Sequence, residues 1–166
     1  MFLAIYIALR RASPSFMAIA TTLSFVGIAV YLATETAFSM LSLSDQYAAA
    51  TTDAQRALFL AAGQAMFAEQ VGAGTGTYMA FVLIGVAGLI IATVMLRSNI
   101  FGKVTASVGI LANVIILAYY IGLPFVSMHP SLLIYSASGL VYLIWIILIG
   151  KRLFQLAQGG SKEEAR

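Results

Sequence analysis

The chain has 166 residues, of which 61% are hydrophobic and 9% are charged, and its formal net charge is +3. An ordinary soluble domain is about 45–50% apolar and about 25% charged, so the composition excludes a soluble enzyme and a disordered tail. The mean hydropathy of +0.98 instead indicates an all-α integral membrane protein. The nine lysines and arginines are scattered along the chain and form no basic patch, so we expect no nucleic-acid partner.

The first apolar segment, residues 2–9, is too short to cross a bilayer, because a helix of this length rises only about 12 Å. It also lacks the basic region and the small-residue cleavage site of a signal peptide. We expect either an interfacial stub or the end of a helix whose start lies outside this sequence.

Four longer apolar segments are each predicted to cross the membrane. They cover about residues 15–43, 77–96, 104–126 and 132–150, and none contains a lysine or an arginine. We expect one transmembrane domain over residues 1–154, built as a four-helix bundle, and a polar cytoplasmic tail over residues 155–166.

Eight of the nine basic residues fall on one side of these predicted spans, and Arg56 alone falls on the other. The eight are Arg10 and Arg11, Arg97 and Lys103, Lys151 and Arg152, and Lys162 and Arg166 in the tail. The positive-inside rule makes that side cytoplasmic, so both ends of the four-span body, including the C-terminus, should be cytoplasmic.

The long connection on the outer side should contain an amphipathic helix over residues 54–69. Thr52 and Gln55 have the spacing of a capping box. We expect the apolar side chains of this helix to lie against the outer face of the bundle or among the lipid headgroups; these are Leu58, Phe59, Ala62, Met66 and Phe67. The alternative is a solvated connecting helix.

Small and polar residues follow one line on each predicted span and mark its inward face. Helices in lipid associate through small residues, so we predict helix packing at Gly85, Gly88 and Ala92 on the second span and at Gly109 on the third. A low-polarity pocket for a ligand would be lined from the same faces by Tyr31, Glu35, Asn113, Tyr120 and Tyr135.

Two of these candidate ligand residues carry most of the chemical interest. Glu35 is the one acid in a predicted span, and such acids are functional candidates. It lies about 28 Å along the span, near the outer edge of the membrane. At that depth Glu35 has either a structural role or a role in binding a ligand or a proton. Asn113 lies near the midplane, where its amide would either hold two helices together or contact a ligand.

The residues needed for most enzyme chemistry are missing. There is no cysteine, one histidine, and no lysine in any predicted span. We therefore predict no cofactor, no metal site and no catalytic residue. The remaining enzyme hypothesis pairs Glu35 with a tyrosine or with His129 as acid and base.

Three stretches of sequence resemble an uncharacterised family of small bacterial multi-pass membrane proteins, catalogued as a domain of unknown function. They are LSLSDQY with ATTDAQRA and AAGQA between residues 41 and 65, VMLRSNIFGKVTA at 94–106, and IGKRLF at 149–154. The resemblance implies a helical fold in a bacterial cytoplasmic membrane and no established activity. Family members usually have a further N-terminal helix.

Two functions fit these observations. The first is a non-catalytic membrane protein that acts by helix packing, as a homo-oligomer or as an accessory subunit of a membrane complex. The alternative is a binder or carrier of a lipid or small apolar molecule, held in an outward-facing pocket within the membrane.

Overall fold

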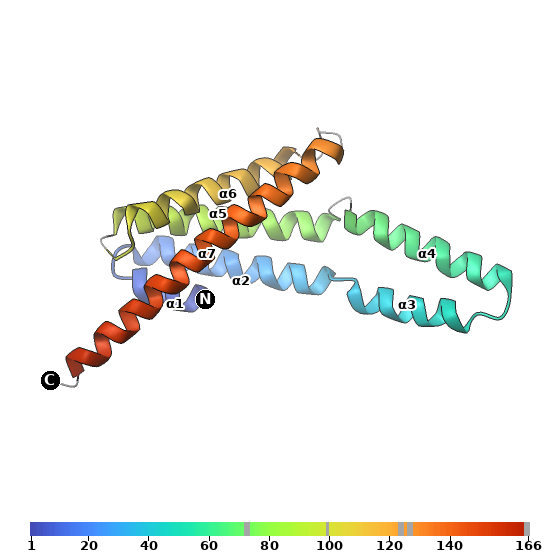
Figure 1. Cartoon of the computed structure of the whole chain (residues 1–166), viewed down its shortest axis with the longest axis horizontal. Helices are drawn as coiled ribbons and strands as arrows, with labels where there is room; N and C mark the ends of the chain where they lie inside the picture. The colour runs from blue at the N-terminus through green and yellow to red at the C-terminus, as the bar shows by residue number, and fades with distance from the viewer. Residues whose placement is uncertain (72–73, 99, 123–124, 126–127, 165–166) are drawn as a thin grey trace. The chain divides into compact units, whose positions relative to one another are not determined.

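A computed structural model (Figure 1) describes the backbone of residues 1–71, 74–98, 100–122, 125 and 128–164. Within these ranges the side chains of residues 70, 71, 128–135, 137, 157 and 159–164 are not described. The regular elements of the described chain are all α-helices. The predicted all-α class is therefore confirmed.

The chain divides into two compact units, one formed by Met1–Gly27 with Phe81–Arg166 and the other by Ile28–Ala80. The predicted transmembrane domain over residues 1–154 includes parts of both units and stays a prediction. The smaller unit forms because the connection between the first two predicted spans is itself helical, and its helices contact each other.

The larger unit contains α1 (Phe2–Leu9), the first part of α2 (Pro14–Thr34), most of α5 (Thr75–Arg97), α6 (Lys103–Gly122) and α7 (Met128–Glu164). Its core consists of fully buried apolar side chains from each of these helices, among them Ile5, Leu9, Met17, Ile91, Met95, Ala106, Trp145 and Ile149. The short N-terminal segment is thus a helix that packs into the bundle through two side chains one turn apart.

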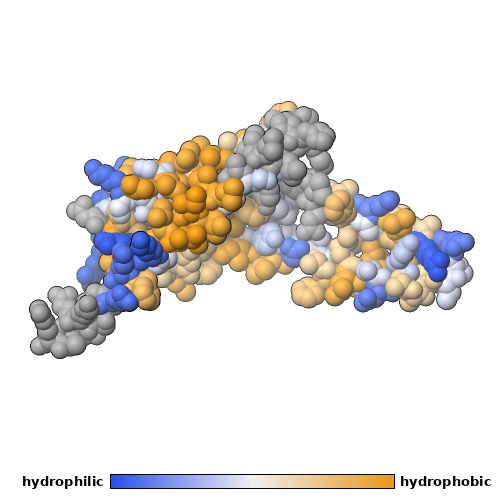
Figure 2. All heavy atoms as spheres, in the orientation of Figure 1, coloured by the Kyte–Doolittle hydropathy of each residue, from blue (hydrophilic) through white to orange (hydrophobic). Residues whose placement is uncertain are grey.

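Within the described residues, four helical segments are long and apolar enough to cross a membrane: Pro14–Ala49, Thr75–Arg97, Lys103–Gly122 and Ser138–Leu156. Many of their large apolar side chains remain exposed, and hydrophobic atoms cover much of the bundle surface seen in Figure 2. An apolar exterior of this kind matches a lipid environment, which supports a membrane protein with a helical bundle.

The first predicted span, residues 15–43, is interrupted in the structure. Helix α2 ends at Thr34, and α3 (Ala37–Ala49) begins after a two-residue break. The carboxylate of Glu35 accepts hydrogen bonds from the backbone N–H groups of Thr36 and Ala37, at 3.1 and 3.3 Å. This caps the start of α3, so Glu35 does not lie on a continuous helical face.

The fourth predicted span and the predicted tail are one helix. Helix α7 continues to Glu164 through the tail expected at residues 155–166. Leu153, Gln155 and Leu156 are good helix formers, and no proline follows Lys151. Polarity at the end of this segment therefore marks the end of the apolar surface and not the end of the helix.

The smaller unit is organised around a hairpin of α3 and α4 (Asp53–Val71). The predicted outer helix, residues 54–69, thus agrees with α4 to within two residues. The Thr52 hydroxyl accepts a hydrogen bond from the Gln55 N–H at 3.3 Å, while the Gln55 side chain accepts one from the Thr51 N–H at 3.2 Å. These two bonds form a reciprocal cap, as the capping box predicts. The one difference is that the Gln55 side chain accepts from the N–H of Thr51 and not from that of Thr52.

Candidate functional site

The five residues predicted to line a ligand pocket belong to separate parts of the structure. Tyr31 and Glu35 lie in the unit Ile28–Ala80, whereas Asn113 and Tyr120 lie in the larger unit. The Tyr135 side chain lies outside the described residues, as does that of His129. A pocket formed by all five therefore stays a prediction, and the site is best built from each unit separately.

Asn113 lies at the contact between α5 and α6 and is completely buried. Its Nδ2 donates a 2.7 Å hydrogen bond to the Gly109 carbonyl one turn earlier, while its Oδ1 has no partner within the described chain. A Cβ on Gly88 would overlap the Asn113 amide. The Gly88 Cα–H therefore faces this amide, a weak interaction common where helices approach closely.

The other residues predicted to pack helices occupy the same region of the bundle. A Cβ on Gly109 would overlap the indole of Trp145, and Ala92 is completely buried beside it. A Cβ on Gly85 would lie 2.9 Å from the Leu117 side chain. These small residues let α5, α6 and α7 approach closely, which is how helices associate in lipid.

Tyr120 lies beside an apolar cavity of about 330 Å³ in the larger unit. Its ring stacks on Phe81, with centroids 5.0 Å apart and planes 5° apart. Helices α1, α5, α6 and α7 contribute the remaining lining residues, which are Phe2, Ile84, Ile116, Ser136, Ser138, Gly139 and Tyr142. The volume is at the lower end of the range for small-molecule sites.

Sequence reasoning predicted Tyr120 as a pocket residue and missed the apolar members of this cavity. Phe2 belongs to the N-terminal segment, which looked too short to cross the membrane, and the sequence analysis singled out none of Phe81, Ile84 and Ile116. Ser138, Gly139 and Tyr142 carry a detectable signal, since Ser138 and Gly139 precede Tyr142 by four and three residues, which places them on one helix face.

Glu35 has a local structural role in the smaller unit, where it caps α3. Two backbone N–H groups at the start of α3 would otherwise have no partner within the helix. The contacts of Glu35 therefore fit the structural interpretation of this residue.

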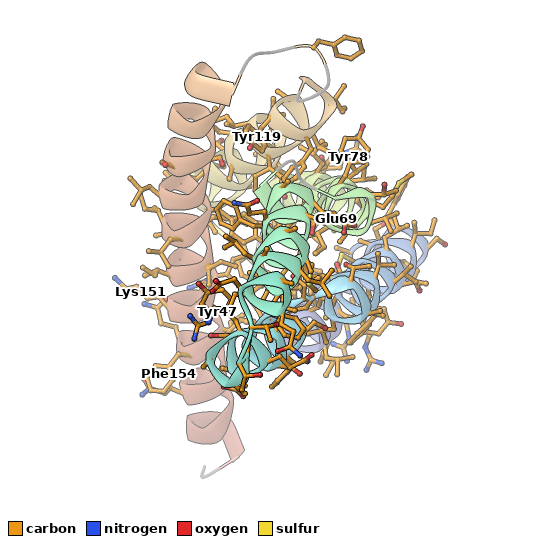
Figure 3. All side chains as sticks on the ribbon, turned by 90° about the vertical axis from the view of Figure 1, so that its right-hand side faces the viewer. Tyr47, Glu69, Tyr78, Tyr119, Lys151 and Phe154 are labelled. Carbon is orange, nitrogen blue, oxygen red and sulfur yellow. The ribbon has the colours of Figure 1, made fainter. Side chains whose placement is uncertain are left out.

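The hairpin of α3 and α4 carries exposed apolar side chains on both of its helices. No residue of α3 is buried, and five large apolar side chains of the hairpin are more than half exposed, namely Phe38, Leu41, Leu58, Leu60 and Phe67. The two helices meet through half-buried side chains, with Gly63 of α4 close to Leu43 of α3. A groove of about 330 Å³ lies between them, lined mainly by apolar residues and bordered by Tyr47, which Figure 3 labels.

The chemistry of metal binding is not assembled in the part of the chain that the structure describes. No three histidine, aspartate or glutamate side chains gather there into a group that could hold a metal ion. The features that remain are apolar: the cavity beside Tyr120, the tightly packed helix contact and the hairpin of α3 and α4.

Together these features describe a helical protein whose long apolar helices could cross a membrane. Comparison of the chain with models of known protein families, with curated protein sequences and with solved structures found no match. The resemblance to an uncharacterised bacterial membrane family therefore stays a prediction.

Proposed function

We propose that the protein is a non-catalytic integral membrane protein that acts by helix packing, as a homo-oligomer or as an accessory subunit of a membrane complex. We place it in the cytoplasmic membrane of a bacterium with its C-terminus in the cytoplasm, as the family resemblance and the positive-inside rule favour. The observation that carries the proposal is the apolar surface of the α3–α4 hairpin.

This hairpin lacks a core that could stabilise it alone. Of the described side chains between residues 37 and 69, only that of Ala50 is buried. Exposed apolar surface on this scale marks an interaction site. A covering surface would remove these side chains from water, at about 25 cal/mol for each Å² buried.

The distribution of the exposed side chains favours a protein over the membrane surface as that cover. At 100° per residue, Leu60 and Phe67 lie on one side of α4, and Leu58 lies about 160–180° away. One flat bilayer surface cannot cover both sides. Helices that lie on membranes also carry many lysines and arginines, whereas α3 and α4 contain Asp45, Asp53 and Glu69 against Arg56 alone.

Native mass spectrometry after extraction in a mild detergent tests the proposal. We expect the protein as a multiple of its 17.6 kDa mass, or bound to another protein. The double variant Leu60→Glu/Phe67→Glu should dissociate, whereas Gln46→Glu, which adds charge to the hairpin at a polar exposed position, should leave the assembly intact. A monomer with no bound protein would refute it.

A second candidate function is the binding or carriage of a lipid or small apolar molecule, and the cavity beside Tyr120 supports it. Gly139 lines this cavity, and a Cβ there meets nothing within 4 Å. Gly139→Phe should therefore fill the cavity and abolish the retention of a bound apolar molecule. Gly150→Phe is the matched control, because Gly150 lies on nearly the same face of α7 and is equally open. Equal retention by both variants would contradict this function.

A further inference from the structure

A second apolar groove lies at the opposite end of the larger unit from the Tyr120 cavity. It has a volume of about 310 Å³ and runs between the start of α2 and the last turns of α5. Phe16, Leu89, Ile90 and Val94 form its apolar walls, and Ser13, Thr93 and Arg97 supply its polar groups. The groove is therefore apolar along its length, and Arg97 gives it one cationic border.

The basic residues of this unit gather at the same end. The connection between α1 and α2, which contains Arg10 and Arg11, contributes to the groove and so lies beside Arg97. Arg152 of α7 donates a 2.7 Å hydrogen bond to the carbonyl of Ile100, close in sequence to Lys103. The hydrophilic atoms seen at this end of the bundle in Figure 2 agree with this arrangement.

This positive charge has little counter-charge within its own unit. Residues 1–27 and 81–162 contain no aspartate or glutamate. A cluster of cations at the end of a bundle of apolar helices attracts the anionic headgroups of a bilayer. Arginine is also suited to phosphate, because its planar guanidinium can donate two parallel hydrogen bonds.

We propose that this groove binds one anionic phospholipid, with the phosphate at Arg97 and an acyl chain along Phe16, Leu89 and Ile90. The apolar walls accept the chain, and the cationic border selects a headgroup with net negative charge over a zwitterionic one. Binding here ties the start of α2 to the end of α5. This groove is separate from the hairpin surface and from the Tyr120 cavity. The proposal of a lipid site is therefore tested independently of the proposed function.

Quenching of tryptophan fluorescence by brominated acyl chains tests the site in reconstituted vesicles. Phe16→Trp places a reporter in the groove, and Val104→Trp places one outside it, beside Lys103 at the same end, where residue 104 is 71% exposed. The unaltered chain gives the background, because its single tryptophan, Trp145, is completely buried. A few mole per cent of brominated anionic or zwitterionic lipid is added to an unbrominated zwitterionic bilayer.

We expect brominated anionic lipid to quench the reporter at residue 16 more strongly than the zwitterionic lipid does, and more strongly than it quenches the reporter at residue 104. Adding Arg97→Gln should lower the affinity for anionic lipid by about tenfold, the effect of losing a charged hydrogen-bond donor. Thr93→Phe, which fills the groove, should also reduce quenching. Lys151→Gln removes the same charge from the outer side of α7, where Figure 3 labels this lysine, and should have little effect.

Two results would overturn the proposal. Equal quenching at residues 16 and 104 would show only the general attraction of anionic lipid to a basic surface. Equal losses with Arg97→Gln and Lys151→Gln would show that net charge, and not the groove, controls binding. The Thr93→Phe variant keeps all charges, so its loss of quenching supports the groove even if Arg97→Gln proves unstable.

Discussion

The contact between Gly88 and Asn113 leads to a quantitative prediction about the stability of the bundle. Replacing Gly88 by alanine adds a methyl group where the Asn113 amide already lies. Overpacking of this kind costs about 1–3 kcal/mol. If the amide moves aside, it loses its 2.7 Å hydrogen bond to the Gly109 carbonyl, which is worth about 0.5–1.5 kcal/mol.

The helix preference of alanine offsets part of this cost, by up to about 1 kcal/mol. We therefore expect Gly88→Ala to lower the free energy of unfolding by about 1–2 kcal/mol. Gly150→Ala is the control for helix preference alone, because a Cβ at Gly150 meets nothing within 4 Å, and it should be neutral or slightly stabilising.

Unfolding by sodium dodecyl sulfate in mixed micelles measures both effects. Asn113→Ala in the Gly88→Ala background makes room for the new methyl group, so the double variant should regain stability, with a coupling energy of about 1–2 kcal/mol. The reasoning fails if Gly88→Ala is as stable as Gly150→Ala, or if the second substitution restores nothing.

Three further predictions concern single contacts. Gly109→Ala should destabilise the protein more than Gly88→Ala does, because the buried indole of Trp145 cannot move as an amide can; the same detergent titration checks the order. Glu35→Ala should cost about 1 kcal/mol by removing the cap of α3, visible as faster amide hydrogen exchange in its first turn, whereas unchanged exchange would contradict this role. Arg152→Lys should lose the 2.7 Å bond to the Ile100 carbonyl and cost about 1–2 kcal/mol, measured as increased proteolysis between α5 and α6, with Lys151→Arg as the control.

The class of the fold follows from sequence because length and apolarity are local properties. A run of about 20 apolar residues has few folded alternatives in lipid, so the helices α5 and α6 begin within two residues of the predicted starts. The break after Thr34 could not be predicted in this way. Residues 37–43 remain mostly apolar, and the interruption depends on the Glu35 side chain folding back onto two backbone N–H groups.

The sites could be predicted from the sequence less well than the helices, because they depend on contacts between residues that are distant in the sequence. The small residues at the α5–α6 contact carry a spacing signal, but only the structure pairs Gly88 with Asn113 and Gly109 with Trp145. Phe2 carries no signal at all for the cavity, since nothing local shows that a short N-terminal helix reaches residues more than 70 positions away.

The charge of +3 on the whole chain is the sum of two units of opposite charge. This difference connects the proposal of a protein-binding hairpin with that of a lipid-binding groove. Residues 28–80 hold four acids and one arginine, whereas the rest of the chain holds eight bases and two acids. An anionic bilayer surface attracts the second group and repels the first. The hairpin therefore gains little from lying on lipid and can use its apolar side chains to bind protein, while the basic end of the bundle is suited to hold lipid.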